Sequence, residues 1–241
     1  MTTTYLITGA SRGLGLEFAR QLLASSPNNV VIAAARNPST ATELQALVKA
    51  NPGRIESVKL DVSDEQSVEA GVAEVAKSTL GKGGIDVLIN NAGVLTAGWK
   101  SATQTFVSFV ESATAHQLKY PRFSKPRSLA DLQKDLQTNL FGVISITHAL
   151  LPLLREGSQK KIWTVSSLCG SLGGSLSDGP AAAMYSVSKA AVNMYLVKLA
   201  RELDEEKFTV IAFHPGYVTT DMNGGTSGPA EISREESVEK S

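Results

Sequence analysis

The chain has 241 residues, 42% of them hydrophobic, and its 23 basic and 23 acidic side chains give a formal net charge of zero. This length and apolar content suit one large α/β domain, and the balanced charge argues against nucleic acid as a partner. The single cysteine, Cys169, excludes an intrachain disulfide, and no apolar run approaches the roughly 20 residues of a membrane helix. Residues 1–4 lead straight into an apolar run and leave no room for a signal peptide, so we expect a cytoplasmic protein without a membrane anchor.

A glycine-rich turn follows the first apolar run, at residues 5–7. Gly9, Gly13 and Gly15 have the spacing G-x-x-x-G-x-G, and apolar residues at helical spacing follow over 14–23. Glycine lets the backbone approach a pyrophosphate closely, and the N-terminus of the following helix favours negative charge. The order strand, turn, helix therefore predicts a dinucleotide site rather than an ordinary loop.

Strands and helices alternate along the rest of the chain. Apolar runs predict strands at 30–34, 55–60, 86–89, 161–165 and 209–213, and helical periodicity predicts helices at 40–50, 64–80, 129–154 and 184–203. This alternation predicts an α/β protein with a doubly wound parallel sheet, a Rossmann fold, in a single domain.

A tyrosine and a lysine lie four residues apart in the last predicted helix. Tyr185 and Lys189 would present a phenol and an ammonium on one helix face. A nearby cation stabilises phenolate, so we expect Lys189 to lower the pKa of Tyr185 from its ordinary value of about 10. Such a phenol can exchange a proton while hydride moves to or from carbon, which indicates a nicotinamide-dependent oxidoreductase.

These motifs together resemble the short-chain dehydrogenase/reductase family over most of 5–222. The resemblance rests on motifs in the family's order: the glycine turn, Asp61, Asn90 to Gly93, Asn139, Ser166 and Ser167, Tyr185 with Lys189, and His214 to Thr220. Within the family, the chain is most similar to fungal ketoreductases of the norsolorinic-acid-ketoreductase kind and to related carbonyl reductases.

The resemblance implies four catalytic residues. Tyr185 would be the general acid, Lys189 would lower its pKa and hold the nicotinamide ribose, and Asn139 would hold a water that links Lys189 to solvent. Ser167 would orient the substrate carbonyl. The segment between this serine and the tyrosine is longer than the family's usual one, so Ser166 and Ser171 remain rivals for that role.

The resemblance also implies a cofactor site, for which NADP(H) is favoured. No acid ends the second strand, where NAD-preferring folds place one; Arg36 stands there instead, and Arg12 adds a second cation that can pair with a 2′-phosphate. The expected cofactor-binding residues are Gly9, Ser11, Arg12, Gly13, Leu14, Gly15, Arg36, Asp61, Val62, Asn90, Ala92, Gly93, Tyr185, Lys189, Pro215, Gly216, Val218 and Thr220. No metal site is expected, because His116, His148 and His214 are far apart in sequence.

Two regions depart from the family pattern. An atypical insertion near 97–128 is open to three interpretations: a substrate lid or partner site, a tolerated surface excursion, or translated intron. The chain also lacks the usual last strand, which would make the sixth strand a sheet edge open to association. We therefore divide the chain into a reductase domain at 1–222 and a polar, disordered tail at 223–241.

The leading hypothesis is NADPH-dependent reduction of a ketone or aldehyde, polyketide-like compounds included, to an alcohol. The alternatives are a cofactor-binding but catalytically impaired regulatory or interaction protein, and a truncated gene-model fragment. The expected partner is a small-molecule carbonyl or alcohol. The resemblance also implies a homodimer or homotetramer paired through the helices near 129–154 and 184–203, and the sequence does not decide between them.

Overall fold

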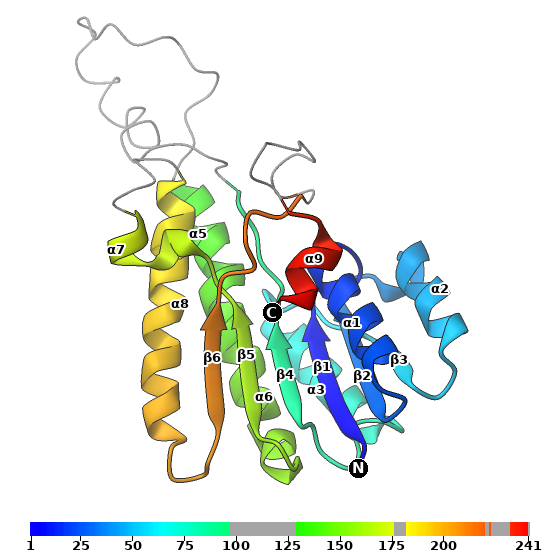
Figure 1. Ribbon diagram of the computed structural model, residues 1–241. Helices are drawn as coiled ribbons and strands as arrows, with labels where there is room; N and C mark the ends of the chain where they lie inside the picture. The colour runs from blue at the N-terminus through cyan, green and yellow to red at the C-terminus, as the bar shows by residue number, and fades with distance from the viewer. Residues whose placement is uncertain (97–128, 176–181, 220–221, 223–231, 241) are drawn as a thin grey trace, which may run out of the picture.

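The computed structural model describes residues 1–96, 129–175, 182–219, 222 and 232–240. A six-stranded, fully parallel sheet has the order β3-β2-β1-β4-β5-β6. The strands are β1 (Thr3–Thr8), β2 (Asn29–Ala35), β3 (Ile55–Lys59), β4 (Val87–Asn90), β5 (Lys161–Val165) and β6 (Thr209–Phe213). All arrows point the same way in Figure 1, so the carboxyl ends of the strands share one edge. The predicted doubly wound sheet is confirmed.

Helices cover both faces of this sheet. The longer ones are α1 (Gly13–Ser25), α2 (Thr42–Ala50), α3 (Glu65–Lys77), α5 (Leu129–Leu136), α6 (Gly142–Glu156) and α8 (Ala183–Glu202). One apolar core joins α3, α6 and α8 to the sheet, and a second joins α1 and α2 to the other face. Leu6 of β1 belongs to the first core and its neighbour Ile7 to the second, as side chains alternate along a strand. All seven residues of β2 are buried, as expected for a strand covered on both sides.

The shorter helical elements join the longer ones. They are η1 (Pro38–Thr40), the π-helical turn η2 (Gln137–Phe141), η3 (Leu168–Gly170), α7 (Leu172–Ser175) and α9 (Arg234–Glu239). With η2 between α5 and α6, the helical stretch Leu129–Glu156 is long and apolar enough to cross a membrane by length and composition, which we did not expect from the sequence. Its residues Ile146, Leu150 and Leu154 are fully buried in the first core, so the α6 part of this stretch packs one face on the sheet.

A buried aspartate joins three segments at the amino ends of the strands. Asp86 Oδ2 accepts a hydrogen bond from the Thr4 backbone N–H at 2.8 Å. Its Oδ1 accepts from the Ser158 N–H and hydroxyl, both at 2.7 Å, and from the Gln159 N–H at 3.2 Å. Burial alone would raise the pKa of Asp86, but these hydrogen bonds outweigh it and lower the pKa below 3.8. The carboxylate thus ties β1 and β4 to the segment that leads into β5.

The end of the chain differs from our expectation of a disordered tail. Residues 223–231 lie outside the described residues, but Ile232 bridges to Val218 and helix α9 follows. Helix α9 packs on α1, with Val238 in the second core. For 232–240 the prediction of disorder was therefore wrong. This segment is mostly polar, but its one valine, Val238, is only 9% exposed and anchors the helix in the core.

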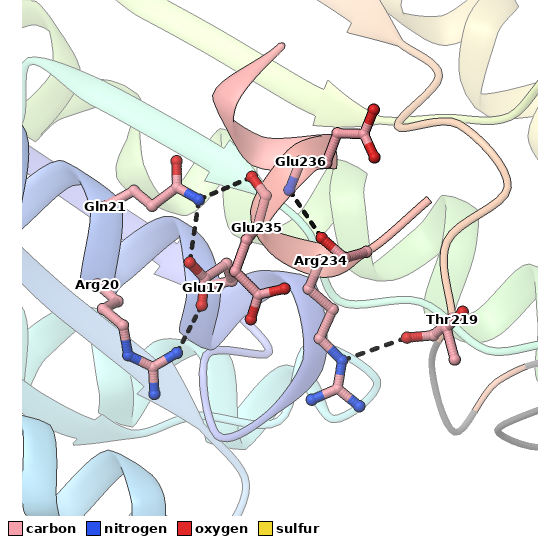
Figure 2. A network of polar contacts seen from close by, with 8 residues as sticks. Glu17, Arg20, Gln21, Thr219, Arg234, Glu235 and Glu236 are labelled. Carbon is pink, nitrogen blue, oxygen red and sulfur yellow. Dashed lines mark hydrogen bonds and ion pairs between the residues drawn. The ribbon is translucent and has the colours of Figure 1, made fainter. Parts of the chain in front are cut away.

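Figure 2 shows how α9 is held. Gln21 of α1 donates to the Glu235 carbonyl at 2.9 Å, and Arg234 donates to the Thr219 carbonyl at 3.3 Å. The hydroxyl of Ser237, which is 1% exposed, donates to the Pro215 carbonyl at 2.5 Å. Helix α9 therefore connects α1 to the 214–219 loop, which follows β6.

Candidate active site and cofactor cleft

The glycine turn connects β1 to α1 at the point where the strand order reverses, between β1 and β4. Gly9 has a φ of 68°, which favours glycine. A Cβ on Gly15 would meet the Gly9 carbonyl oxygen and the Asn91 side chain. Asn91, which follows β4, donates through Nδ2 to the Thr8 carbonyl at 2.9 Å and to the Gly9 carbonyl at 3.3 Å. Open α/β sheets bind their ligands at this kind of switch point.

A cavity of about 570 Å³ opens at the carboxyl ends of the strands. It is lined by most of the expected cofactor residues: Gly9, Ser11, Arg12, Gly13, Leu14, Arg36, Asp61, Val62, Ala92, Gly93, Tyr185, Lys189, Pro215, Gly216 and Val218. Helix α1 begins at Gly13 with no side-chain cap and no acid in its first turn, so its N-terminus can face a pyrophosphate. Glycine turn, helix N-terminus and cavity size together fit a dinucleotide.

Two described residues of the expected cofactor set, Gly15 and Asn90, do not line this cavity. Gly15 serves the turn by leaving room for the Gly9 carbonyl. Asn90 is 2% exposed, and its Nδ2 donates to Thr147 at 3.1 Å in the core, so its neighbour Asn91 lines the cavity instead. Thr220 lies outside the described residues.

Tyr185 and Lys189 lie in the first turns of α8, beside the end of β5. They are 8% and 5% exposed, and the Lys189 ammonium lies 5.6 Å from the centroid of the Tyr185 ring. Lys189 Nζ donates to the Val165 carbonyl, the last of β5, at 2.8 Å. The expected pairing of phenol and ammonium on one helix face is present, and both side chains line the cavity.

Burial controls the titration of both groups. It raises the pKa of Tyr185 to about 12; the charge of Cys169 adds to the rise, and the hydrogen bond with Ser167 opposes it. It lowers the pKa of Lys189 to about 8, and the charge of Asp135 opposes that fall. Our expectation that Lys189 lowers the Tyr185 pKa was wrong: burial of the phenol raises the pKa, and Lys189 is not among the groups that shift it.

The hydrogen bonds distinguish the three candidate serines. Ser166 is 5% exposed and donates to Asn193 Oδ1 at 2.6 Å. Ser167 hydrogen-bonds Tyr185 and also caps η3, where its Oγ accepts from the Cys169 N–H at 3.2 Å. Ser171 does not line the cavity, whereas Ser167 does. The geometry therefore favours Ser167, which stays a prediction as the catalytic serine.

Asn139 lies in the π-helical turn η2 and is fully buried. Its Oδ1 accepts from the Val94 N–H at 2.8 Å, and its Nδ2 donates to the Val94 carbonyl and to Ser188 Oγ, both at 2.9 Å. Asn139 thus holds the segment after β4 against α8, next to Lys189. Its role in holding a water stays a prediction.

Sequence reasoning missed several residues that line the cavity. They include Ala35, Leu60, Ser63, Val94, Leu95, Thr96, Thr138, Val165 and Met222, which only their position beside recognised motifs could have indicated. Asn91, His214 and Tyr217 also line the cavity; they lie inside named motifs but were not among the expected cofactor residues.

Known proteins that resemble this chain share its fold class. A profile described as short chain dehydrogenase matches residues 3–229. An uncharacterised oxidoreductase of Schizosaccharomyces pombe is 36% identical over 226 residues, covering 92% of this chain and 78% of that protein. The short chain dehydrogenase gsfK of Penicillium aethiopicum is 33% identical over 225 residues, covering 92% of this chain and 78% of that one.

Among solved structures, the NADPH-bound carbonyl reductase from chicken fatty liver superposes with a TM-score of 0.79 at 31% identity. The superposition covers 99% of this chain and 88% of that one. Fold and site define a Rossmann-type oxidoreductase. The chain belongs to the short-chain dehydrogenase family.

Proposed function

We propose that the protein reduces a ketone or aldehyde to an alcohol with NADPH. The observation that carries this proposal is the convergence of two groups of residues on one cavity. Ser167, Tyr185 and Lys189 reach it from the β5 side of the switch point, and Arg12 and Arg36 reach it from the β1 and β2 side. A dinucleotide that spans the switch point would meet both groups.

NADPH would supply the hydride for the carbonyl carbon. Ser167 and Tyr185 would donate hydrogen bonds to the carbonyl oxygen and orient it. Tyr185 would then pass its proton to that oxygen as negative charge develops there. A phenol with a pKa of about 12 is protonated at neutral pH, which is the form that reduction requires. Lys189 would hold the ribose hydroxyls beside the phenol, and Asn139 would position the segment that borders them.

The preference for NADPH rests on the end of β2. Ala35 ends the strand and Arg36 follows, where a carboxylate would repel a 2′-phosphate. Arg36 and Arg12 both line the cavity, and a guanidinium can pair with a phosphate through two parallel hydrogen bonds.

A fluorescence titration with NADPH, and with NADH in parallel, tests the proposal. The wild-type chain should bind NADPH more tightly than NADH. Arg36→Ala should weaken NADPH binding by roughly tenfold, the loss of one charge-assisted contact, and leave NADH unchanged. Lys49→Ala, an exposed change on α2 that alters the net charge equally, should affect neither. Binding of neither nucleotide would refute the proposal.

Turnover is tested separately, by the loss of NADPH absorbance with a panel of aromatic and aliphatic aldehydes and ketones. Tyr185→Phe should bind NADPH like the wild type and show no reduction. Tight binding without turnover of any carbonyl by the wild type would favour the impaired, regulatory alternative. The cytoplasmic location and the homodimer or homotetramer remain predictions.

A further inference from the structure

The mechanism above does not use a buried acidic residue on α5, the helix that packs on α8. Asp135 lies in the last turn of α5, one helical turn before Asn139, and is fully buried. Burial raises its pKa above 3.8. A buried carboxylate is costly unless hydrogen bonds and an opposite charge compensate it, so its surroundings should show what compensates this one.

One carboxylate oxygen of Asp135 has a structural partner. Oδ1 accepts from the Thr96 backbone N–H at 2.9 Å, and the Thr96 hydroxyl also hydrogen-bonds this carboxylate. Asn139, on the same side of the helical stretch, pairs with both the N–H and the carbonyl of Val94. The two side chains therefore hold alternate residues of the segment after β4, and this segment lines the cavity.

The other oxygen, Oδ2, is buried and has no hydrogen-bond partner in the part of the chain that the structure describes. Hydrogen bonds from the Thr96 N–H and hydroxyl offset part of the burial cost, and Lys189 of α8, which packs on α5, adds a weaker compensation. Asp135 in turn favours the charged form of Lys189. For Lys189 itself, the only hydrogen bond from the ammonium among the described residues goes to the neutral Val165 carbonyl. The two groups are 0% and 5% exposed on helices that pack together, so each charge favours the other.

We propose that Asp135 is a positioning residue that acts through Lys189, as the buried counter-charge that keeps the Lys189 ammonium protonated beside Tyr185. Among the described residues, Asp131 of α5 is the other charged group that acts on Asp135. The adjoining Tyr185 of α8 is influenced by Cys169 of η3 and by Asp135. Asp135 is the acid that acts on Lys189 directly.

A double-mutant cycle tests the pairing without any cofactor. Lys189→Met leaves the Asp135 carboxylate buried and uncompensated, whereas Asp135→Asn keeps an oxygen for the Thr96 N–H and removes the charge. At pH 7 the two changes should therefore be non-additive in urea unfolding, with Asp135→Asn raising the stability of the Lys189→Met protein. The coupling should fade toward pH 10, where the Lys189 ammonium has lost its proton. Additive effects at pH 7 would overturn the proposal.

The second readout is the pH dependence of NADPH binding, and this part rests on the proposed role of Lys189. At pH 6.5 the dissociation constants of Asp135→Asn and wild type for NADPH should agree within about twofold. At pH 8.5 the variant should bind NADPH roughly three- to tenfold more weakly than the wild type. The reason is that Lys189 of the variant loses its proton at a lower pH than Lys189 of the wild type. The matched control Asp131→Asn, one turn earlier on α5, should follow the wild type.

The two readouts separate the two proposals. If wild type binds no NADPH, the proposed function fails and the unfolding cycle still decides the role of Asp135. If Asp135→Asn weakens binding equally at both pH values, Asp135 only supports the Thr96 segment and the counter-charge is refuted. If the Asp135→Asn single variant does not fold, the double variant is compared with Lys189→Met alone. A double variant that is more stable than Lys189→Met supports the counter-charge, and one that is less stable refutes it.

Discussion

Replacing Asp86 by asparagine should destabilise the fold strongly while leaving the cofactor cleft intact. Asparagine has one acceptor oxygen. If this oxygen serves the Ser158 and Gln159 donors, the amide NH₂ faces the Thr4 N–H and leaves that donor buried and unpaired. The unmet donor costs about 1–3 kcal/mol, and the remaining hydrogen bonds lose their charge assistance, so we expect a loss of about 3 kcal/mol. For a domain of this size that corresponds to a fall in Tm of about 6–12 °C.

The pH dependence of this loss provides a stricter test. The pKa of Asp86 is lower in the folded protein than in the unfolded chain. Its contribution is therefore fully present above about pH 4 and is lost as the pH falls through the folded-state pKa. The difference in the free energy of unfolding between wild type and Asp86→Asn, measured with urea, should stay constant from pH 8 to 5 and shrink below pH 4. A cost below about 1 kcal/mol, or a gap unchanged at pH 3, would refute the reasoning.

Two controls accompany this measurement. Asp64→Asn changes an exposed aspartate that caps α3 through the N–H groups of Gln66 and Ser67. Asparagine caps helices about as well, so this variant should stay within about 0.5 kcal/mol of the wild type. NADPH affinity at low temperature should be unchanged in Asp86→Asn, because the cavity lies at the opposite ends of the strands.

Other changes probe the cleft and the chain end. Gly15→Ala should abolish NADPH binding in the fluorescence titration, because its Cβ would collide with the Gly9 carbonyl. In Gly13→Ala the Cβ meets open space. This variant should lose only the roughly 1–2 kcal/mol of stability that a left-handed alanine (φ 60°) costs. Equal affinity in the two variants would contradict this steric argument. Ser237→Ala should cost about 1–3 kcal/mol in thermal unfolding, because it leaves the Pro215 carbonyl without this donor, and should weaken NADPH binding a few-fold. An unchanged affinity would mean that α9 does not position the 214–219 loop.

Much of the fold could be predicted because its signals are local. The apolar run near 30–34 has no polar alternation, which indicates burial on both faces, and β2 is buried throughout. The glycine turn indicated both the switch point and the start of α1. The positions of Tyr185 and Lys189 on one helix face followed from helical spacing alone.

The errors concern properties that depend on three-dimensional packing. The direction of the Tyr185 pKa shift depends on how deeply the phenol is buried, and sequence spacing does not show burial. The choice between Asn90 and Asn91 depends on which face of the sheet each side chain meets. The order at 232–240 depends on Val238 reaching a distant helix. Each required contacts between segments far apart in the chain.

The contacts of α9 also imply a reciprocal effect. Suppose that the docking of α9 on α1 strengthens the binding of a ligand to the 214–219 loop. Bound ligand must then stabilise the docking of α9 by the same free energy, because coupling between two sites is reciprocal. The helix lies on the outer surface of the domain, beside α1 (Figure 1). An antibody or a protease directed at this helix would then sense whether the cleft is filled, without entering it.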